Sequence, residues 1–202
     1  MTERIKKTLV GVDGNKDFTH KDGALCVPNK NRLPGEPTHN QIIRRGIAMF
    51  DSGLFDLRFM TTENHPPNHI EFVRHGVHGL FNTPGQKYHP ALIDLLTKAN
   101  MVLEKGQHPD IISYSAVYSP LWIPHISMMR VHNIEEVYLW GWYWTHCLGR
   151  TAVEYSEQGF RTFVVKDATM GIPDVRSINY MREMLKLAEV EYVTTRDLGI
   201  NA

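Results

Sequence analysis

Short apolar runs rich in β-branched and aromatic residues alternate along this chain with longer segments in which apolar residues recur every three or four positions. This alternation constrains the fold most, because strands separated by helices pair in parallel through βαβ units. The runs that predict strands cover 8–12, 57–61, 101–104, 136–141, 162–165 and 192–194. Helices are expected over 39–50, 89–98, 120–132, 145–158 and 174–188. The pattern therefore predicts an α/β fold, a three-layer α/β/α sandwich around a central, mostly parallel six-stranded sheet.

Length and charge narrow the function classes. The 202 residues suit one domain, so we expect residues 1–202 to fold as a single unit. The formal net charge is zero, from 22 basic and 22 acidic residues, and so the excess of positive charge expected of a nucleic-acid-binding protein is absent. No run approaches the ~20 apolar residues of a membrane span. Two cysteines, Cys26 and Cys147, indicate no disulfide framework and favour a cytoplasmic protein with a small-molecule ligand.

Two connections are longer than such a fold requires. They cover 13–38 and 63–88 and are rich in proline, glycine, asparagine or histidine. Long loops inside a compact domain are usually functional or disordered. Because ligands bind beyond the carboxyl ends of the strands in an open α/β sheet, we expect these loops to border the functional site.

Three chemically complementary side chains follow three of the predicted strands. Asp13 ends the first, Lys105 ends the third, and Cys147 follows the fourth. Thr145 suits a helix N-cap and Gly159 a helix end, which puts Cys147 in the first turn, where the helix dipole lowers a thiol's pKa and free N–H groups form an oxyanion site. Singly, each residue also suits a bland role: a turn cap, a solvated or ion-paired lysine, a packed thiol. Together they favour a nucleophilic site.

The second long loop is rich in histidine. Glu63 lies two residues before the first of five histidines, so both side chains of an extended segment can face one point; the five are His65, His69, His75, His78 and His89. Imidazole and carboxylate ligands suit Zn²⁺, Mn²⁺ or Fe²⁺ in a catalytic role. The spacing matches no general zinc motif, so polar loop histidines remain the alternative.

At the level of motifs, the chain resembles the nicotinamidase and pyrazinamidase branch of the isochorismatase-like cysteine hydrolases. The family's D-x-Q-N-D-F motif corresponds to DGNKDF at 13–18, and its G-x-L-x-V-P motif to GALCVP at 23–28. Its K-G and Y-S-A motifs match residues 105–106 and 114–116, and its cysteine motif matches GWYWTHCLGRTA at 141–152. A later D-A matches residues 167–168. The resemblance runs through nearly the whole chain and implies the isochorismatase-like, Rossmann-like fold.

The resemblance also implies roles for these residues. Asp13, Lys105 and Cys147 form a catalytic triad, with Asp13 as proton acceptor from the thiol and Lys105 as its electrostatic partner. The backbone N–H groups of Tyr143 and Cys147 form an oxyanion hole, with a cis peptide between Trp142 and Tyr143.

A metal site is implied as well. Counting back from Thr83-Pro84-Gly85 places the family's later histidine at His78, and its D-x-H pair at Glu63 and His65. His69 lies where some members approach the metal. Two positions depart from the family, because Glu63 replaces an aspartate and His75 replaces a tryptophan of the pocket wall. Phe18, His75 and Trp142 are the expected contacts to the substrate ring.

The expected reaction is hydrolysis of nicotinamide to nicotinic acid and ammonia through a cysteine thioester, assisted by a divalent metal, most simply zinc. A related hydrolase of another small amide, carbamoyl or ureido compound is the first alternative. A metal-binding or ligand-sensing protein without turnover is the second. We expect a homo-oligomer that binds neither nucleic acid nor membrane.

Overall fold

The computed structural model describes residues 4–202 and has a central six-stranded sheet. The strands are β1 (Lys7–Val12), β2 (Leu57–Glu63), β3 (Met101–Lys105), β4 (Glu136–Trp142), β5 (Arg161–Met170) and β6 (Glu191–Val193). Their order is β3-β2-β1-β4-β5-β6, and every neighbouring pair is parallel. The order reverses direction between β1 and β4, the position at which such sheets bind ligands. The predicted fold class and all six strands are confirmed.

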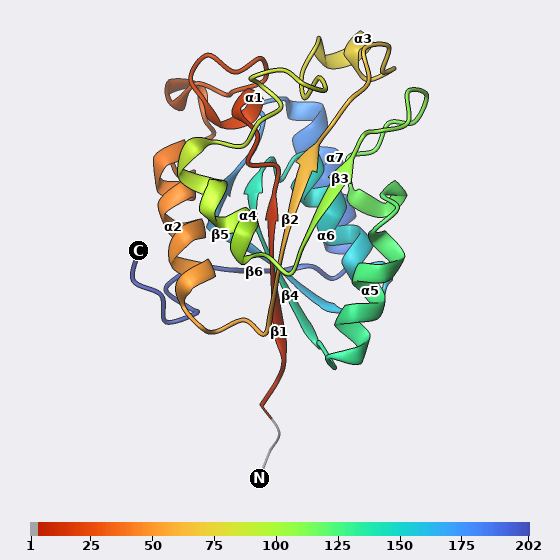
Figure 1. The fold of residues 1–202 in the computed structure, drawn as a ribbon. Coiled ribbons are helices and arrows are strands. Elements are labelled where there is room, and N and C mark those ends of the chain that lie inside the picture. Colours follow the sequence, from red (N-terminus) through yellow and green to blue (C-terminus); the bar gives the residue numbers. More distant parts are fainter. Residues whose placement is uncertain (1–3) are drawn as a thin grey trace.

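Seven α-helices and three short 3₁₀ turns connect the described strands. The helices are α1 (Lys16–Thr19), α2 (His39–Asp51), α3 (Phe72–His75), α4 (Ile93–Lys98), α5 (Trp122–Val131), α6 (Cys147–Glu157) and α7 (Val175–Leu187). The 3₁₀ turns are η1 (Asn29–Asn31), η2 (Pro90–Leu92) and η3 (Ala116–Tyr118). Helices α2 and α4 cover one face of the sheet, and α5, α6 and α7 cover the other (Figure 1).

The core lies in two layers, one on each face. Residues of α5, α6 and α7 pack on one face, with Met129, Leu148 and Leu185 wholly buried. On the opposite face Ile42 and Met49 of α2 are wholly buried against the sheet. All seven residues of β4 are buried, as expected of a central parallel strand covered on both faces. Burial of this apolar surface is the main stabilising term and fixes the strand ends in place.

Local chemistry explains the helix boundaries. Thr38 starts α2 with a capping box, because its side chain accepts from Gln41 N while the Gln41 side chain accepts from Thr38 N. The helix expected over 89–98 begins instead as the 3₁₀ turn η2 and becomes helical only at α4.

Strand β5 is longer than the predicted 162–165 and runs to Met170. Its pairing with β4 shifts register between Leu139 and Gly141, after which Gly141 pairs with Thr169. The polar pair Lys166 and Asp167 at this irregularity breaks the apolar pattern from which the strand end was predicted.

The strands point toward the end of the molecule where α1 and α3 lie (Figure 1). Both helices belong to the long connections that the sequence singles out. Among residues 4–202, no helix has the length and apolar character needed to cross a membrane.

Candidate active site

Four ionisable or nucleophilic side chains meet at the carboxyl edge of the sheet. Asp13 directly follows β1, Glu63 ends β2, Lys105 ends β3, and Cys147 opens α6 after β4. Glu63 and Lys105 are cross-strand partners in the β2–β3 pairing. Parallel strands present their carboxyl ends at one edge, so side chains far apart in the sequence become neighbours here.

Asp13 and Cys147 both lie within contact distance of Lys105. Lys105 Nζ is 2.9 Å from Asp13 Oδ2 and 3.4 Å from Cys147 Sγ. Asp13 Oδ1 accepts a hydrogen bond of 2.8 Å from the Thr61 hydroxyl. The three side chains are almost entirely withdrawn from solvent, with 1% of Asp13, 1% of Lys105 and 7% of Cys147 exposed. The structure thus brings together the three residues that the sequence predicts as a triad.

Glu63 joins this group from the other side. Its Oε1 contacts Lys105 Nζ and accepts a long hydrogen bond of 3.6 Å from the Cys147 thiol. Asp13, by comparison, has a carboxylate oxygen within 4.8 Å of the sulfur. Sequence reasoning assigned Glu63 to the metal site alone, whereas the longer side chain reaches both groups. Two carboxylates therefore stand beside the thiol.

Burial sets the protonation of the group. Desolvation raises the pKa of the Cys147 thiol well above its ordinary value, although the Lys105 charge acts to lower it. Burial also raises the pKa of Asp13, against the charge of Lys105. Burial acts to lower the pKa of Lys105, but Asp13 and the other nearby anions outweigh it and hold that pKa well above its usual range. The expectation of a thiol acidified by the helix start is wrong for the resting site, and a base must take the proton.

The turn before α6 supplies backbone donors. The peptide between Trp142 and Tyr143 is cis, as the resemblance implies. Within residues 4–202, neither the N–H of Tyr143 nor that of Cys147 donates a hydrogen bond. Cys147 is the first helical residue, so its N–H has no acceptor within the helix. Both N–H groups are available to an oxyanion.

Thr145 does not cap α6, contrary to the prediction. His146 occupies the N-cap position, without a capping hydrogen bond from its side chain. The Thr145 hydroxyl instead accepts from Ile172 N at 2.9 Å and ties the turn to the end of β5. At the other end, Gly159 follows the helix with φ of 85°, which agrees with its predicted role as helix end.

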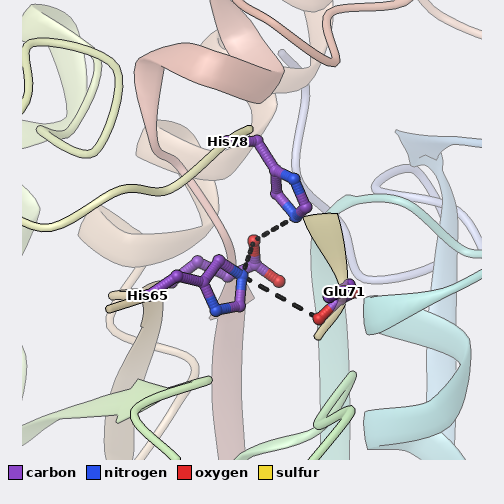
Figure 2. A group of neighbouring side chains, drawn as sticks. His65, Glu71 and His78 are labelled. Carbon is purple, nitrogen blue, oxygen red and sulfur yellow. Dashed lines mark hydrogen bonds and ion pairs between the residues drawn. The ribbon is translucent and has the colours of Figure 1, made fainter. Parts of the chain in front are cut away.

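A second cluster shares Glu63 with the first. Ligand atoms of Glu63, His65, Glu71 and His78 all lie within 4.8 Å of one another, and all four residues are buried. Glu63 Oε2 is 3.2 Å from His65 Nε2 and 3.3 Å from His78 Nε2. Figure 2 shows the two imidazoles and the Glu71 carboxylate pointing toward one centre. Glu71 was missed from the sequence, where its only signal is one more carboxylate in a histidine-rich loop.

The donors fit a divalent metal. His65 Nδ1 donates to Gly106 O at 2.9 Å and His78 Nδ1 to Gly76 O at 2.8 Å, so both rings turn Nε2 toward the cluster. Glu71 Oε2 is buried without a hydrogen-bond partner among the described residues. A buried carboxylate oxygen without a hydrogen bond is costly, and a cation within reach of two carboxylates and two imidazoles would remove that cost.

His69 lies beside this cluster. Its ring is tilted by 30° against that of His65 with centroids 4.0 Å apart, and its Nε2 donates to Ile111 O at 3.2 Å. Its other nitrogen, Nδ1, accepts from Glu71 N at 3.3 Å. Both ring nitrogens of His69 therefore have hydrogen-bond partners, and neither is free to face the cluster in this arrangement.

Two of the three residues predicted to contact the substrate ring, Phe18 and His75, pack against His78. Phe18 packs edge-on against His78 and Tyr143, with centroids 6.0 Å and 6.1 Å away. His75 donates to or accepts from the Tyr114 hydroxyl at 3.0 Å and lies 5.7 Å from the ring of His146. Tyr114 and His146, to which the sequence assigned no contact, pack against His75.

Trp142 lies elsewhere than predicted. Its indole N–H donates to His39 Nδ1 at 2.9 Å, and the two rings stack in the core beneath α2. The cis peptide lies at the site, but the side chain turns into the sheet's other layer. Cys26 belongs to the same region, with its sulfur 3.4 Å from His39 Nε2.

Comparison with known proteins finds similar individual proteins, although no family model matches the chain. It is 28% identical to the nicotinamidase of Saccharomyces cerevisiae over 222 residues, covering 93% of this chain and 99% of that protein. It is 27% identical to the nicotinamidase of Acinetobacter baylyi, covering 94% and 93% respectively.

Solved structures agree with the sequence relatives. The pyrazinamidase of Pyrococcus horikoshii, solved in complex with zinc, superposes with a TM-score of 0.73 at 27% identity, covering 94% of this chain and 99% of that one. The yeast nicotinamidase superposes with a TM-score of 0.76 at 26% identity, covering 93% and 99%. Motifs, fold and similar proteins converge, and over nearly its whole length the chain is similar to nicotinamidases and pyrazinamidases of the isochorismatase-like cysteine hydrolases.

Proposed function

We propose that this chain, residues 1–202 acting as one hydrolase domain, cleaves nicotinamide to nicotinic acid and ammonia through a thioester on Cys147. The observation that carries the proposal is the contact of Lys105 with both Asp13 and the thiol, 2.9 Å and 3.4 Å away, beside two free backbone donors. A buried nucleophile, an adjacent base and oriented N–H groups are the requirements of acyl transfer. The nicotinamidases of yeast and Acinetobacter baylyi support the choice of amide.

The first half-reaction transfers the acyl group. Asp13 takes the thiol proton, and the sulfur attacks the carboxamide carbon. Lys105 stabilises the thiolate, whose charge would otherwise be unfavourable in a buried site. The negative oxygen of the tetrahedral adduct accepts hydrogen bonds from the N–H groups of Tyr143 and Cys147. The C–N bond then breaks, the proton on Asp13 moves to the nitrogen, and ammonia leaves.

The second half-reaction restores the enzyme. Water attacks the thioester while Asp13 accepts one of its protons. The C–S bond breaks, the thiolate is released as the leaving group, and nicotinic acid departs. The thiol regains its proton from Asp13, so that each cycle consumes one water and releases one ammonia.

Glu63, His65, Glu71 and His78 would hold a divalent metal, with zinc first and iron or manganese as alternatives. When bound, the metal supplies a Lewis acid that can fix the pyridine nitrogen of the substrate. The two histidines are already oriented by backbone carbonyls, so the site needs little rearrangement. Phe18 and His75 flank this position and are proposed to contact the substrate ring.

We also propose a cellular compartment and an oligomeric state for the protein. Both cysteines are free, which supports a reducing, cytoplasmic setting. Four large apolar side chains of the metal-binding loop are exposed, and this supports a homo-oligomer: Ile70, Val73, Val77 and Phe81.

The test is ammonia release from nicotinamide by the zinc-reconstituted protein. We expect turnover by the wild type and by Cys26→Ala, and its loss in Cys147→Ala. Mass spectrometry of the quenched reaction should find an acyl adduct on the peptide that carries Cys147. Hydrolysis of other amides only would replace nicotinamide as substrate, and unchanged turnover by Cys147→Ala would refute the mechanism.

A further inference from the structure

A cavity of about 570 Å³ lies against the wall of the candidate active site. Tyr114 and His146 line it, and the same two rings contact His75 at centroid distances of 6.2 Å and 5.7 Å. The cavity is distinct from the metal cluster and the triad, none of whose residues lines it. The volume falls within the ~300–1,000 Å³ of small-molecule sites.

Three arginines from three separate elements converge on this cavity. Arg74 comes from α3, Arg150 from α6 and Arg176 from the first turn of α7. Arg150 is paired with Glu154, whose Oε1 accepts from its Nε at 2.8 Å. Within residues 4–202, Arg74 and Arg176 form no ion pair with a carboxylate. The charges of these two guanidinium groups are therefore not neutralised by a carboxylate, and both can bind an anion.

The other polar groups near the cavity leave this positive charge in place. Burial lowers the pKa of His146 to about 4, so this imidazole is neutral at pH 7. The Asp174 carboxylate accepts from Ser177 N at 2.8 Å and caps α7, and it does not line the cavity. Glu154 is the one carboxylate among the lining residues, and Arg150 already neutralises it.

The cavity also has an aromatic wall. Tyr118 and Tyr180 line it with 64% and 60% of their surface exposed, and the buried Met181 lines it as well. Exposed rings with no packing partner favour stacking with a flat ligand. Guanidinium groups favour phosphate oxygens, which they bind in bidentate fashion.

We propose that this cavity binds a phosphate monoester carried on an aromatic group, of the size of a nucleoside monophosphate. Arg74 and Arg176 hold the phosphate, and the tyrosines hold the ring. The proposal does not depend on which amide the enzyme hydrolyses, because no residue of the proposed mechanism takes part in it.

Isothermal titration calorimetry of the zinc-reconstituted protein tests it with three probes: adenosine monophosphate, inorganic phosphate and adenosine. We expect the nucleotide to bind roughly tenfold or more tightly than either fragment, since each fragment makes only half of the contacts. Arg176→Gln should weaken nucleotide binding roughly tenfold to 100-fold, the loss expected for a charge-assisted hydrogen bond. Lys186→Gln, an exposed change at the far end of α7, is the matched control and should leave binding unchanged.

Each contrary result overturns the proposal in a recognisable way. Equal affinities for the nucleotide and for inorganic phosphate would show that the tyrosines do not bind the ring. Equal affinities for the nucleotide and for adenosine would show that the arginines do not bind the phosphate. Binding that survives Arg176→Gln and disappears when zinc is removed would place the phosphate on the metal. Absence of binding by all three probes would show that the cavity takes no ligand of this class. Arg176 is exposed, so the variant is expected to fold, and its thermal unfolding without ligand checks this.

Discussion

Replacing Lys105 with methionine tests whether the buried ion pairs hold the site together. Lys105 Nζ faces Asp13 Oδ2 at 2.9 Å and also contacts Glu63, and all three side chains are at most 1% exposed. At an effective dielectric constant of ~20, charges this far apart attract each other by about 6 kcal/mol, of which desolvation of the ammonium offsets a part. Lys105→Met leaves two buried carboxylates without their cation. We expect the free energy of unfolding to fall by about 3–5 kcal/mol.

The measurement is urea unfolding of the chelator-treated protein, so that no metal compensates for the lost charge. In a chain of this length, 1 kcal/mol shifts the midpoint of thermal unfolding by about 2–4 °C, so the loss should also appear as roughly 6–20 °C. Adding Glu63→Gln to Lys105→Met should recover part of the stability, because one uncompensated charge is removed. Lys98→Met is the control, since Lys98 pairs with Asp51 at 2.7 Å on the surface, where such pairs contribute below about 1 kcal/mol.

A loss below about 1 kcal/mol in Lys105→Met, or a double variant less stable than the single one, would refute the charge argument. Either result would mean that the carboxylates become neutral at little cost when the lysine is removed. The stability of the site would then rest on packing alone.

Three further predictions concern separate features. Glu71→Gln should weaken zinc binding roughly tenfold to 100-fold, measured by competition with a chromogenic chelator, because its carboxylate faces the cluster. Burial lowers the pKa of His125 to about 4, below ~6.5 in the unfolded chain, so the unfolded state binds the extra proton. Stability is therefore lost as pH falls from ~6.5 toward 4, by about 3 kcal/mol, and His125→Gln should flatten this part of the pH profile of urea unfolding. Gly106→Ala should cost more than the ~1–2 kcal/mol of a left-handed backbone and weaken zinc binding, because its Cβ would lie 2.2 Å from the His65 ring.

Matched controls separate these effects from general destabilisation. Glu157→Gln changes an exposed carboxylate of α6, and His132→Gln an exposed histidine after α5. Gly53→Ala has a similar φ of 70° but nothing within 4 Å of the added methyl group, so it should carry only the backbone cost. Zinc binding equal to wild type in Glu71→Gln would exclude that carboxylate from the ligand set. A pH profile of the same slope in His125→Gln, or equal losses in the two glycine variants, would contradict the other two arguments.

Much of the fold follows from local pattern. Periodicity of apolar residues located all six strands, since each strand is a contiguous run and its burial depends little on distant detail. The same pattern misplaced the end of β5, where a register shift with β4 carries pairing past polar Lys166 and Asp167. Such a shift depends on the partner strand, which no local window contains.

The sequence by itself located Asp13, Lys105 and Cys147 at one edge of the sheet, because each of them ends or follows a strand that the apolar pattern predicts. It also located the loop that brings His65 and His78 together. Motif spacing suffices for this, because parallel strands present their carboxyl ends at the same edge.

Only the tertiary structure decided how those side chains are used. The reach of Glu63 from the imidazoles to Lys105, the place of Glu71 in the cluster, and the turn of Trp142 toward His39 all depend on distances across the sheet. So does the protonated state of the Cys147 thiol, because burial outweighs the nearby lysine. Desolvation and side-chain contact arise from packing between segments far apart in the chain, so they depend on the folded structure and not on local sequence.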